Sequence, residues 1–157
     1  NYSSGLLHDL MNSSKFPPEV LQIESHPYLT QENLVRLAKN YDLEVTAFSP
    51  LGSLSYVELD MADVDESILE QAVVKDIANR IGCTPAQVLL GWGVQRGTSL
   101  VVKSMNPERM AQNLSATEIQ LSQDDMDSIS ALNRNRRYND PGMFCEAAFN
   151  TFHPIYD

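Results

Sequence analysis

The chain has 157 residues, of which 43% are apolar and 20% are charged. This composition is typical of a folded globular protein and excludes the disordered, collagen-like and disulfide-scaffold classes. The formal net charge of −10 opposes binding to nucleic acid and to an anionic membrane surface, so we expect neither partner.

The two cysteines, Cys83 and Cys145, form neither a metal-binding pattern nor a disulfide framework. Their small number fits a reducing compartment, and we expect a cytoplasmic protein. No apolar run approaches the roughly 18 residues of a membrane span. No signal peptide opens the chain, which begins at Asn1 rather than at a methionine, so the expected compartment rests on the cysteines alone.

The first predicted elements form a strand, helix, strand unit. The short apolar segment 20–24 follows the helix-breaking Pro17-Pro18 and predicts a buried strand. Thr30 can cap a helix, and a second strand is predicted over residues 44–48.

The acidic stretch 58–66 predicts an exposed loop rather than a metal site. Apolar residues at helical spacing then predict helices over residues 68–81 and from Thr84-Pro85 onward, and the run 100–102 predicts a third strand. Two more helices are predicted. One opens at Asn106-Pro107, and the other begins with a capping box of Ser122 and Asp125.

Strands that alternate with helices imply an α/β fold with a parallel sheet, either doubly wound or a (β/α)8 barrel. Three strands are too few for either, because a full barrel takes about 250 residues. Parallel sheets also normally have both faces and their edges covered. We therefore expect an incomplete sheet with an open edge.

The stretch directly after the third strand has the composition of an anion site. Asn106, as a helix cap followed by proline, would leave backbone N–H groups and the positive end of a helix dipole free for a phosphate. Lys103 supplies a point charge, Ser104 a hydroxyl, and Arg109 a planar fork. On spacing alone, a capped helix with two solvated cations is the commoner explanation.

The other two strands also end in chemically suggestive residues. Residues 49–53 offer hydroxyls and backbone amides that can hold a pyrophosphate, although this signal alone is weak. Phe48 can stack on a flat cofactor ring or simply fill a core. Gln22 lies within an otherwise apolar strand, so its amide needs partners, which either a ligand or the core can supply.

Several segments together resemble, in order and spacing, the second half of aldo-keto reductases. They are residues 1–3, 22–28, 45–53 and 103–113. Matching motifs in register are far more specific than a single short pattern. The resemblance implies one partial domain over residues 1–157. Residues 1–133 would form the C-terminal half of a (β/α)8 TIM barrel, and residues 134–157 would form a C-terminal substrate loop.

The resemblance also implies a nicotinamide-cofactor site. Asn1 and Gln22 correspond to residues that bind the carboxamide, and Phe48 replaces the usual stacking tyrosine. The remaining implied contacts are Ser49, Leu51 and Ser53 to the pyrophosphate, Lys103, Ser104, Asn106 and Arg109 to the 2′-phosphate, and Gln112 and Asn113 to the adenine. This set favours NADPH. NADH remains open, because Val102 and Gln112 depart from the family's usual proline and glutamate.

The family's catalytic Asp, Tyr, Lys and His all belong to the first half of the barrel, and none of these positions is present in this chain. Because the tyrosine gives a proton to the carbonyl oxygen, we predict no catalytic residue here and no general acid catalysis. His26 corresponds to a structural segment of the family. His8 and His153 are solitary and unassigned.

The tail indicates a substrate class. Residues 138–141, with residues 55–59, resemble the fungal sugar-reductase branch of the family, such as xylose, galacturonate and glyceraldehyde reductases. The implied substrate is the aldehyde of a sugar or sugar acid. Asn139 would bind a sugar hydroxyl or merely form a turn before Asp-Pro. The rest of the closing segment contains Phe144, Phe149 and Phe152.

Two alternatives to a working reductase stay open. A non-catalytic NADPH-binding or regulatory protein would bind the cofactor without turnover. An inactive truncated fragment would aggregate through its open sheet edge. The sequence predicts neither the particular carbonyl substrate nor whether the protein forms a homodimer.

Overall fold

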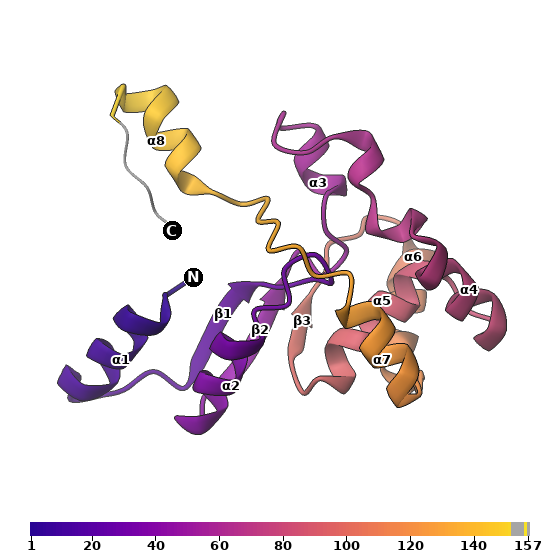
Figure 1. Cartoon of the computed structure of the whole chain (residues 1–157), viewed down its shortest axis with the longest axis horizontal. Coiled ribbons are helices and arrows are strands. Elements are labelled where there is room, and N and C mark those ends of the chain that lie inside the picture. The colour runs from indigo at the N-terminus through magenta and orange to yellow at the C-terminus, as the bar shows by residue number, and fades with distance from the viewer. Residues whose placement is uncertain (152–155, 157) are drawn as a thin grey trace.

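A computed structural model describes residues 1–151 and 156. The elements are α1 (Ser4–Ser13), β1 (Val20–Glu24), α2 (Glu32–Asn40), β2 (Glu44–Phe48), α3 (Leu54–Val57), η1 (Val64–Glu66), η2 (Ile68–Glu70), α4 (Ala72–Ile81), α5 (Pro85–Gln95), β3 (Ser99–Val101), α6 (Pro107–Ser115), η3 (Ala116–Glu118), α7 (Gln123–Ser130) and α8 (Pro141–Phe149). The strands form one parallel sheet in the order β1-β2-β3 (Figure 1). The predicted α/β class and parallel pairing are confirmed.

One face of the sheet is covered by helices. Leu21 and Ile23 of β1 and Val45 of β2 are buried in a core cluster with Leu7 of α1 and Val35 of α2. Because successive side chains of a strand point to opposite faces, the residues between them lie on the other face.

Gln22 lies on the opposite face of the sheet. From the sequence, either a ligand or the core could supply the partners of this amide, and its side chain is exposed. The core therefore does not supply these partners, because the tail covers this face of β1 at Glu24 and not at Gln22. The exposure leaves the amide available to a ligand.

A second core lies among the helices beside β3 (Figure 1). Val88, Leu89 and Trp92 of α5 and Ile129 of α7 are buried in it. They are apolar residues at helical spacing, which places them on one face of each helix. Tyr138 from the tail is also buried there, at 1% exposure, so the tail is part of the packed structure.

Helix α2 does not begin as predicted. Its N-cap is Gln31, which has a left-handed φ of 49° and makes no side-chain cap. Thr30 is used in tertiary contacts instead. Its N–H donates to Asn133 Oδ1 at 3.2 Å, and its carbonyl accepts from Arg96 Nη2 at 2.8 Å. By contrast, the cap predicted at Thr84 is confirmed, with its hydroxyl accepting from the Gln87 N–H.

Two other predictions need correction. Strand β3 begins and ends one residue earlier than the predicted run 100–102, and Val101 is 51% exposed. The acidic stretch 58–66 is not a simple exposed loop. Met61 is 7% exposed within the core, and Glu66 is held by arginines of the tail.

In the described part of the chain, β1 and β3 each pair on one side only, so the predicted open edge is confirmed. The segment predicted as a loop contains a helix, α8, and this helix projects away from the sheet (Figure 1). Phe149 on α8 is exposed, whereas Phe152, His153 and the side chain of Phe144 lie outside the described part. No helix described there is both long and apolar enough to cross a membrane.

Candidate functional site

A hollow of about 360 Å³ lies at the face of the sheet that carries Gln22, and Asn1, Gln22, Phe48 and Asn139 line it. The four residues come from the start of the chain, β1, β2 and the tail. The structure therefore brings together the predicted carboxamide pair, the predicted stacking ring and the predicted sugar-binding amide. Phe48 is half-buried, so it is not a core side chain and remains partly accessible.

Asn1 is held against β1 by two hydrogen bonds. Its amino group donates to the Gln22 carbonyl at 2.7 Å, and its Oδ1 accepts from the Glu24 N–H at 3.3 Å. These two contacts fix Asn1 against β1 beside the hollow.

A tight turn follows β2 and places the predicted pyrophosphate loop at the carboxyl end of the sheet. Ser49 has a left-handed φ of 52°, and its carbonyl accepts from the Gly52 N–H at 2.9 Å. Its hydroxyl contacts the Tyr56 hydroxyl at 2.8 Å. Gly52 has a φ of 78°, and a Cβ at this position would lie 2.5 Å from Ile68 Cδ1. The turn therefore depends on glycine.

Ser53 tests whether this loop suits a phosphate. Its side chain is 1% exposed, and its Oγ has no hydrogen-bond partner among the described residues. A buried hydroxyl without a partner is unfavourable, so a phosphate oxygen or a water molecule at this place would be stabilised. Leu51 is half-buried beside it. The loop therefore fits the pyrophosphate role that the resemblance implies.

The N-terminus of α6 differs from the predicted anion site. Asn106 Oδ1 accepts from the N–H groups of Glu108 at 2.9 Å and Arg109 at 3.1 Å. These groups are therefore not free, and that prediction was wrong because the capping side chain itself occupies them. Ser104 Oγ accepts from the Asn106 N–H at 3.2 Å. Binding of a phosphate here would fall mainly to the exposed side chains of Lys103 and Arg109.

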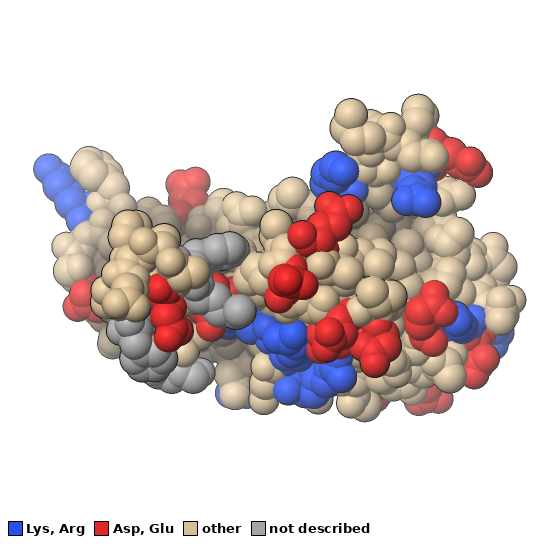
Figure 2. Space-filling view, turned by 90° about the horizontal axis from the view of Figure 1, so that it is seen from above, with Lys and Arg blue, Asp and Glu red and all other residues tan. Residues whose placement is uncertain are grey.

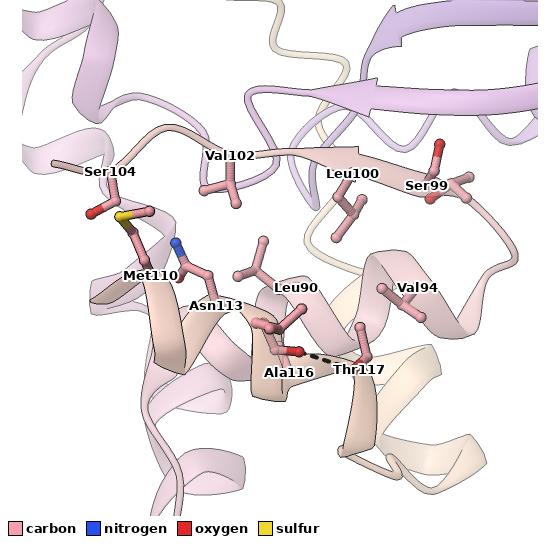
Figure 3. Close-up of a pocket in the computed structure, with 12 residues that line it drawn as sticks. Leu90, Val94, Ser99, Leu100, Val102, Ser104, Met110, Asn113, Ala116 and Thr117 are labelled. Carbon is pink, nitrogen blue, oxygen red and sulfur yellow. Dashed lines mark hydrogen bonds between the residues drawn. The ribbon is translucent and has the colours of Figure 1, made fainter. Parts of the chain in front are cut away.

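A second hollow of about 560 Å³ lies between α5, β3 and α6 (Figure 3). Its lining is mostly apolar and includes Leu90, Leu100 and Met110, while Ser104 and Asn113 supply polar groups near one end. Of the two residues predicted to contact the adenine, Asn113 lines this hollow and Gln112 does not.

Sequence reasoning missed a buried cluster around Glu24. This carboxylate is 0% exposed and accepts the N–H of Tyr138 at 2.8 Å and of Asn139 at 3.0 Å. His26 Nε2 lies 3.0 Å from its Oε1. Burial alone would raise the pKa of Glu24, but these hydrogen bonds, that from His26 first, hold its pKa below the usual value. An acidic residue ending an apolar strand was the available signal.

A second missed cluster joins the tail to the acidic stretch. Glu66 accepts hydrogen bonds from Arg136 Nε at 2.9 Å and from Arg134 Nη2 at 3.2 Å. The hydrogen bond from Arg136 is the main reason that the pKa of Glu66 is lowered. On the face shown in Figure 2, acidic side chains are widespread and most basic ones lie near them.

In the part that the structure describes, no group of three His, Cys, Asp or Glu side chains could hold a metal ion. The polar side chains that line the first hollow are amides, which bind by hydrogen bonds and do not titrate near neutral pH. The arrangement is therefore suited to recognition of a polar, planar ligand.

Comparisons with known proteins agree with this geometry. The sequence profile of the Aldo/keto reductase family matches residues 1–134. The chain is 49% identical over 143 residues to the probable NAD(P)H-dependent D-xylose reductase of Aspergillus fumigatus, covering 90% of this chain and 45% of that protein. It is 46% identical over 143 residues to the NAD(P)H-dependent D-xylose reductase of Aspergillus niger, again covering 90% of this chain and 45% of that protein.

The fold is also similar to the crystal structure of MGS-M4, an aldo-keto reductase enzyme from a Medee basin deep-sea metagenome library. The TM-score is 0.76 at 28% sequence identity, covering 87% of this chain and 47% of that one. The chain thus spans less than half the length of the relatives it matches. The predicted resemblance is confirmed, and the chain belongs to the aldo/keto reductase family.

Proposed function

We propose that this chain provides the cofactor-binding and substrate-binding part of a reductase that uses NADPH, with NADH as the weaker ligand. The substrate is the open-chain aldehyde of a sugar or sugar acid, which is reduced to the alcohol. The observation that carries the proposal is the hollow in which Asn1, Gln22, Phe48 and Asn139 meet. The likeness to the Aspergillus NAD(P)H-dependent D-xylose reductases supports the substrate class and the cofactor.

The strands belong, on this proposal, to a (β/α)8 barrel. Residues 1–133 contribute its C-terminal half, and residues 134–157 contribute the segment over the substrate. Two observations support this arrangement. Gln22 is exposed on its face of β1, and the outer strands β1 and β3 each pair on one side only in the described part of the chain. Parallel sheets are normally covered at both faces, so further strands and helices would complete this one.

Each residue of the hollow has a definite task. The amides of Asn1 and Gln22 can bind both ends of a carboxamide, and the Phe48 ring offers a flat apolar face for stacking. When bound, the nicotinamide supplies the hydride. Asn139, which lines the same hollow, can bind a hydroxyl of the sugar. At the other end of the cofactor, Arg109 can bind the 2′-phosphate with a planar pair of donors.

General acid catalysis is not assigned to any residue of this chain. Because the hollow is lined by amides and one aromatic ring, none of its side chains can deliver a proton to a carbonyl oxygen. We propose that this proton comes from residues outside this sequence, and that the chain alone binds NADPH without reducing an aldehyde.

The direct test is a titration of the purified chain with NADPH and NADH, followed by the fluorescence of the nicotinamide. Trp92 is 2% exposed in the helical core, so its emission serves as a check of folding. We expect saturable binding that is tighter for NADPH, with no consumption of D-xylose. A folded chain that binds neither nucleotide would contradict the proposal.

A further inference from the structure

The residues that line the first hollow are linked through a residue that does not line it. The N–H of Glu24 donates to Asn1 Oδ1 at 3.3 Å, and its carboxylate Oε2 accepts the N–H of Asn139 at 3.0 Å. In the register of the sheet, Glu24 pairs directly with Phe48. By strand alternation it lies on the same face of β1 as Gln22, two residues away. Glu24 therefore connects the tail to every other element of the hollow.

The carboxylate of Glu24 is fully buried, and a buried charge persists only where hydrogen bonds and opposite charges surround it. Three donors meet this need. They are the N–H groups of Tyr138 and Asn139 and the ring nitrogen Nε2 of His26, at 2.8, 3.0 and 3.0 Å. Arg137 Nη1 lies 3.9 Å from Oε2 and adds a positive charge. Two of the three hydrogen bonds thus come from the backbone of the tail.

The His26 ring is placed to hold the carboxylate rather than to take part in chemistry. It is 0% exposed, and its Nδ1 has no hydrogen-bond partner among the described residues. Because a carboxylate can only accept hydrogen bonds, Nε2 is the atom that donates to Glu24. Both oxygens of the carboxylate therefore stay directed at the tail.

We propose that Glu24 is a positioning residue for the substrate. Its carboxylate fixes the backbone of residues 138 and 139 at the end of β1, and this keeps Asn139 in the hollow that Gln22 and Phe48 also line. Glu24 touches neither the cofactor nor the sugar. The inference rests on the proposed function, because a sugar is recognised at this place only if the nicotinamide occupies the hollow beside it.

The test uses Glu24→Gln, which keeps the size of the side chain but replaces one acceptor oxygen with a donor. Amide hydrogen exchange at Tyr138 and Asn139 reports the tail directly, without any ligand. We expect exchange at one or both amides to become about tenfold faster, because a charge-assisted hydrogen bond is lost. The matched control is Asp125→Asn, which removes another buried, ion-paired carboxylate at the start of α7. It should leave these two amides unchanged.

Affinities for NADPH and D-xylose then distinguish a positioning role of Glu24 from a general effect on the stability of the fold. In Glu24→Gln we expect the Kd for NADPH to stay within about twofold, while the Kd of the NADPH complex for D-xylose rises about tenfold. The proposal is overturned if both amides exchange as slowly as before. It is also overturned if the affinities for NADPH and D-xylose fall by the same factor, as a general loss of structure would produce.

A second variant covers the case in which Glu24→Gln does not fold. Asn139→Ala keeps the backbone N–H that Glu24 binds but removes the amide side chain. We expect unchanged exchange at Tyr138 and the same loss of D-xylose affinity, whereas retained D-xylose affinity would leave nothing for Glu24 to position and would overturn the proposal. If the unsubstituted chain binds NADPH but not D-xylose, only the positioning role fails. If it binds neither, the proposed function fails as well.

Discussion

Arg136 binds Glu66 through two parallel hydrogen bonds, from Nε to Oε1 at 2.9 Å and from Nη2 to Oε2 at 3.0 Å. The same Nη2 donates to the carbonyl of Met61 at 3.1 Å. One guanidinium therefore binds both Met61 and Glu66 of the acidic stretch and joins this stretch to the tail that carries Asn139. This contact stabilises the segment that follows the pyrophosphate turn.

Replacing Arg136 with lysine should weaken this connection. Lysine keeps the positive charge but cannot form the planar pair of hydrogen bonds, so Arg136→Lys should lower the free energy of unfolding by about 1 kcal/mol. Urea unfolding followed by circular dichroism measures this change. Arg36→Lys on the exposed side of α2 is the control and should be near neutral. Equal effects of the two substitutions would contradict the role given to Arg136.

The loss of folding stability at acid pH should depend on Glu66. Its pKa is lowered in the folded state, chiefly by the hydrogen bond from Arg136. A lowered pKa stabilises the fold above the unfolded value and loses this effect as the pH falls toward the folded value. The stability difference between the unsubstituted chain and Glu66→Gln should therefore be largest near neutral pH. It should shrink below about pH 4.3, the ordinary value for glutamate. A difference that stays constant with pH would contradict this account.

Two glycines with similar left-handed backbone conformations allow the cost of backbone strain to be measured separately from the cost of steric crowding. Gly52 and Gly82 have φ of 78° and 81°, but only at Gly52 would a Cβ meet a neighbour, Ile68 Cδ1 at 2.5 Å. Gly82→Ala should cost about 1 kcal/mol for the left-handed backbone alone. Gly52→Ala should cost about 1–3 kcal/mol more, because the methyl group enters a packed turn. Thermal unfolding compares the two variants, and similar melting temperatures would show that the turn accepts a side chain.

Local signals in the sequence predicted much of the fold. Strands β1 and β2 have the predicted bounds, because proline and turn residues delimit short apolar runs. The caps at Thr84, Asn106 and Ser122 were also predictable, since each depends on residues within three positions of the cap. Thr30 failed as a cap because its backbone is bound by distant residues, which no local pattern can indicate.

The site residues likewise include some that local sequence patterns indicate and others that they do not. Phe48 and Gln22 could be identified from their places in strands, whereas the contributions of Asn1 and Asn139 to the same hollow were expected only through the family resemblance. The Glu24 cluster was missed because its partners in the tail lie more than 100 positions away, at a separation of 114 for Tyr138. Such a contact is formed by tertiary packing and leaves no periodic signal in the sequence.

Arg109 should decide the preference between the two nucleotides. NADPH differs from NADH by the 2′-phosphate, and the exposed Arg109 side chain stands on the first turn of α6. Loss of a charge-assisted hydrogen bond should raise the Kd for NADPH by about 10- to 100-fold in Arg109→Ala, and the Kd for NADH should change little. Arg36→Ala serves as the control of equal charge. A parallel loss for both nucleotides would show that Arg109 does not bind the phosphate.

The most direct test of the proposed site is the nuclear Overhauser effect between the ring protons of Phe48 and the nicotinamide protons of bound NADPH. A nicotinamide stacked in the hollow of Asn1, Gln22, Phe48 and Asn139 predicts strong cross-peaks that disappear in Phe48→Leu. Saturated binding of NADPH without these cross-peaks would place the nicotinamide elsewhere on the chain and contradict the central claim.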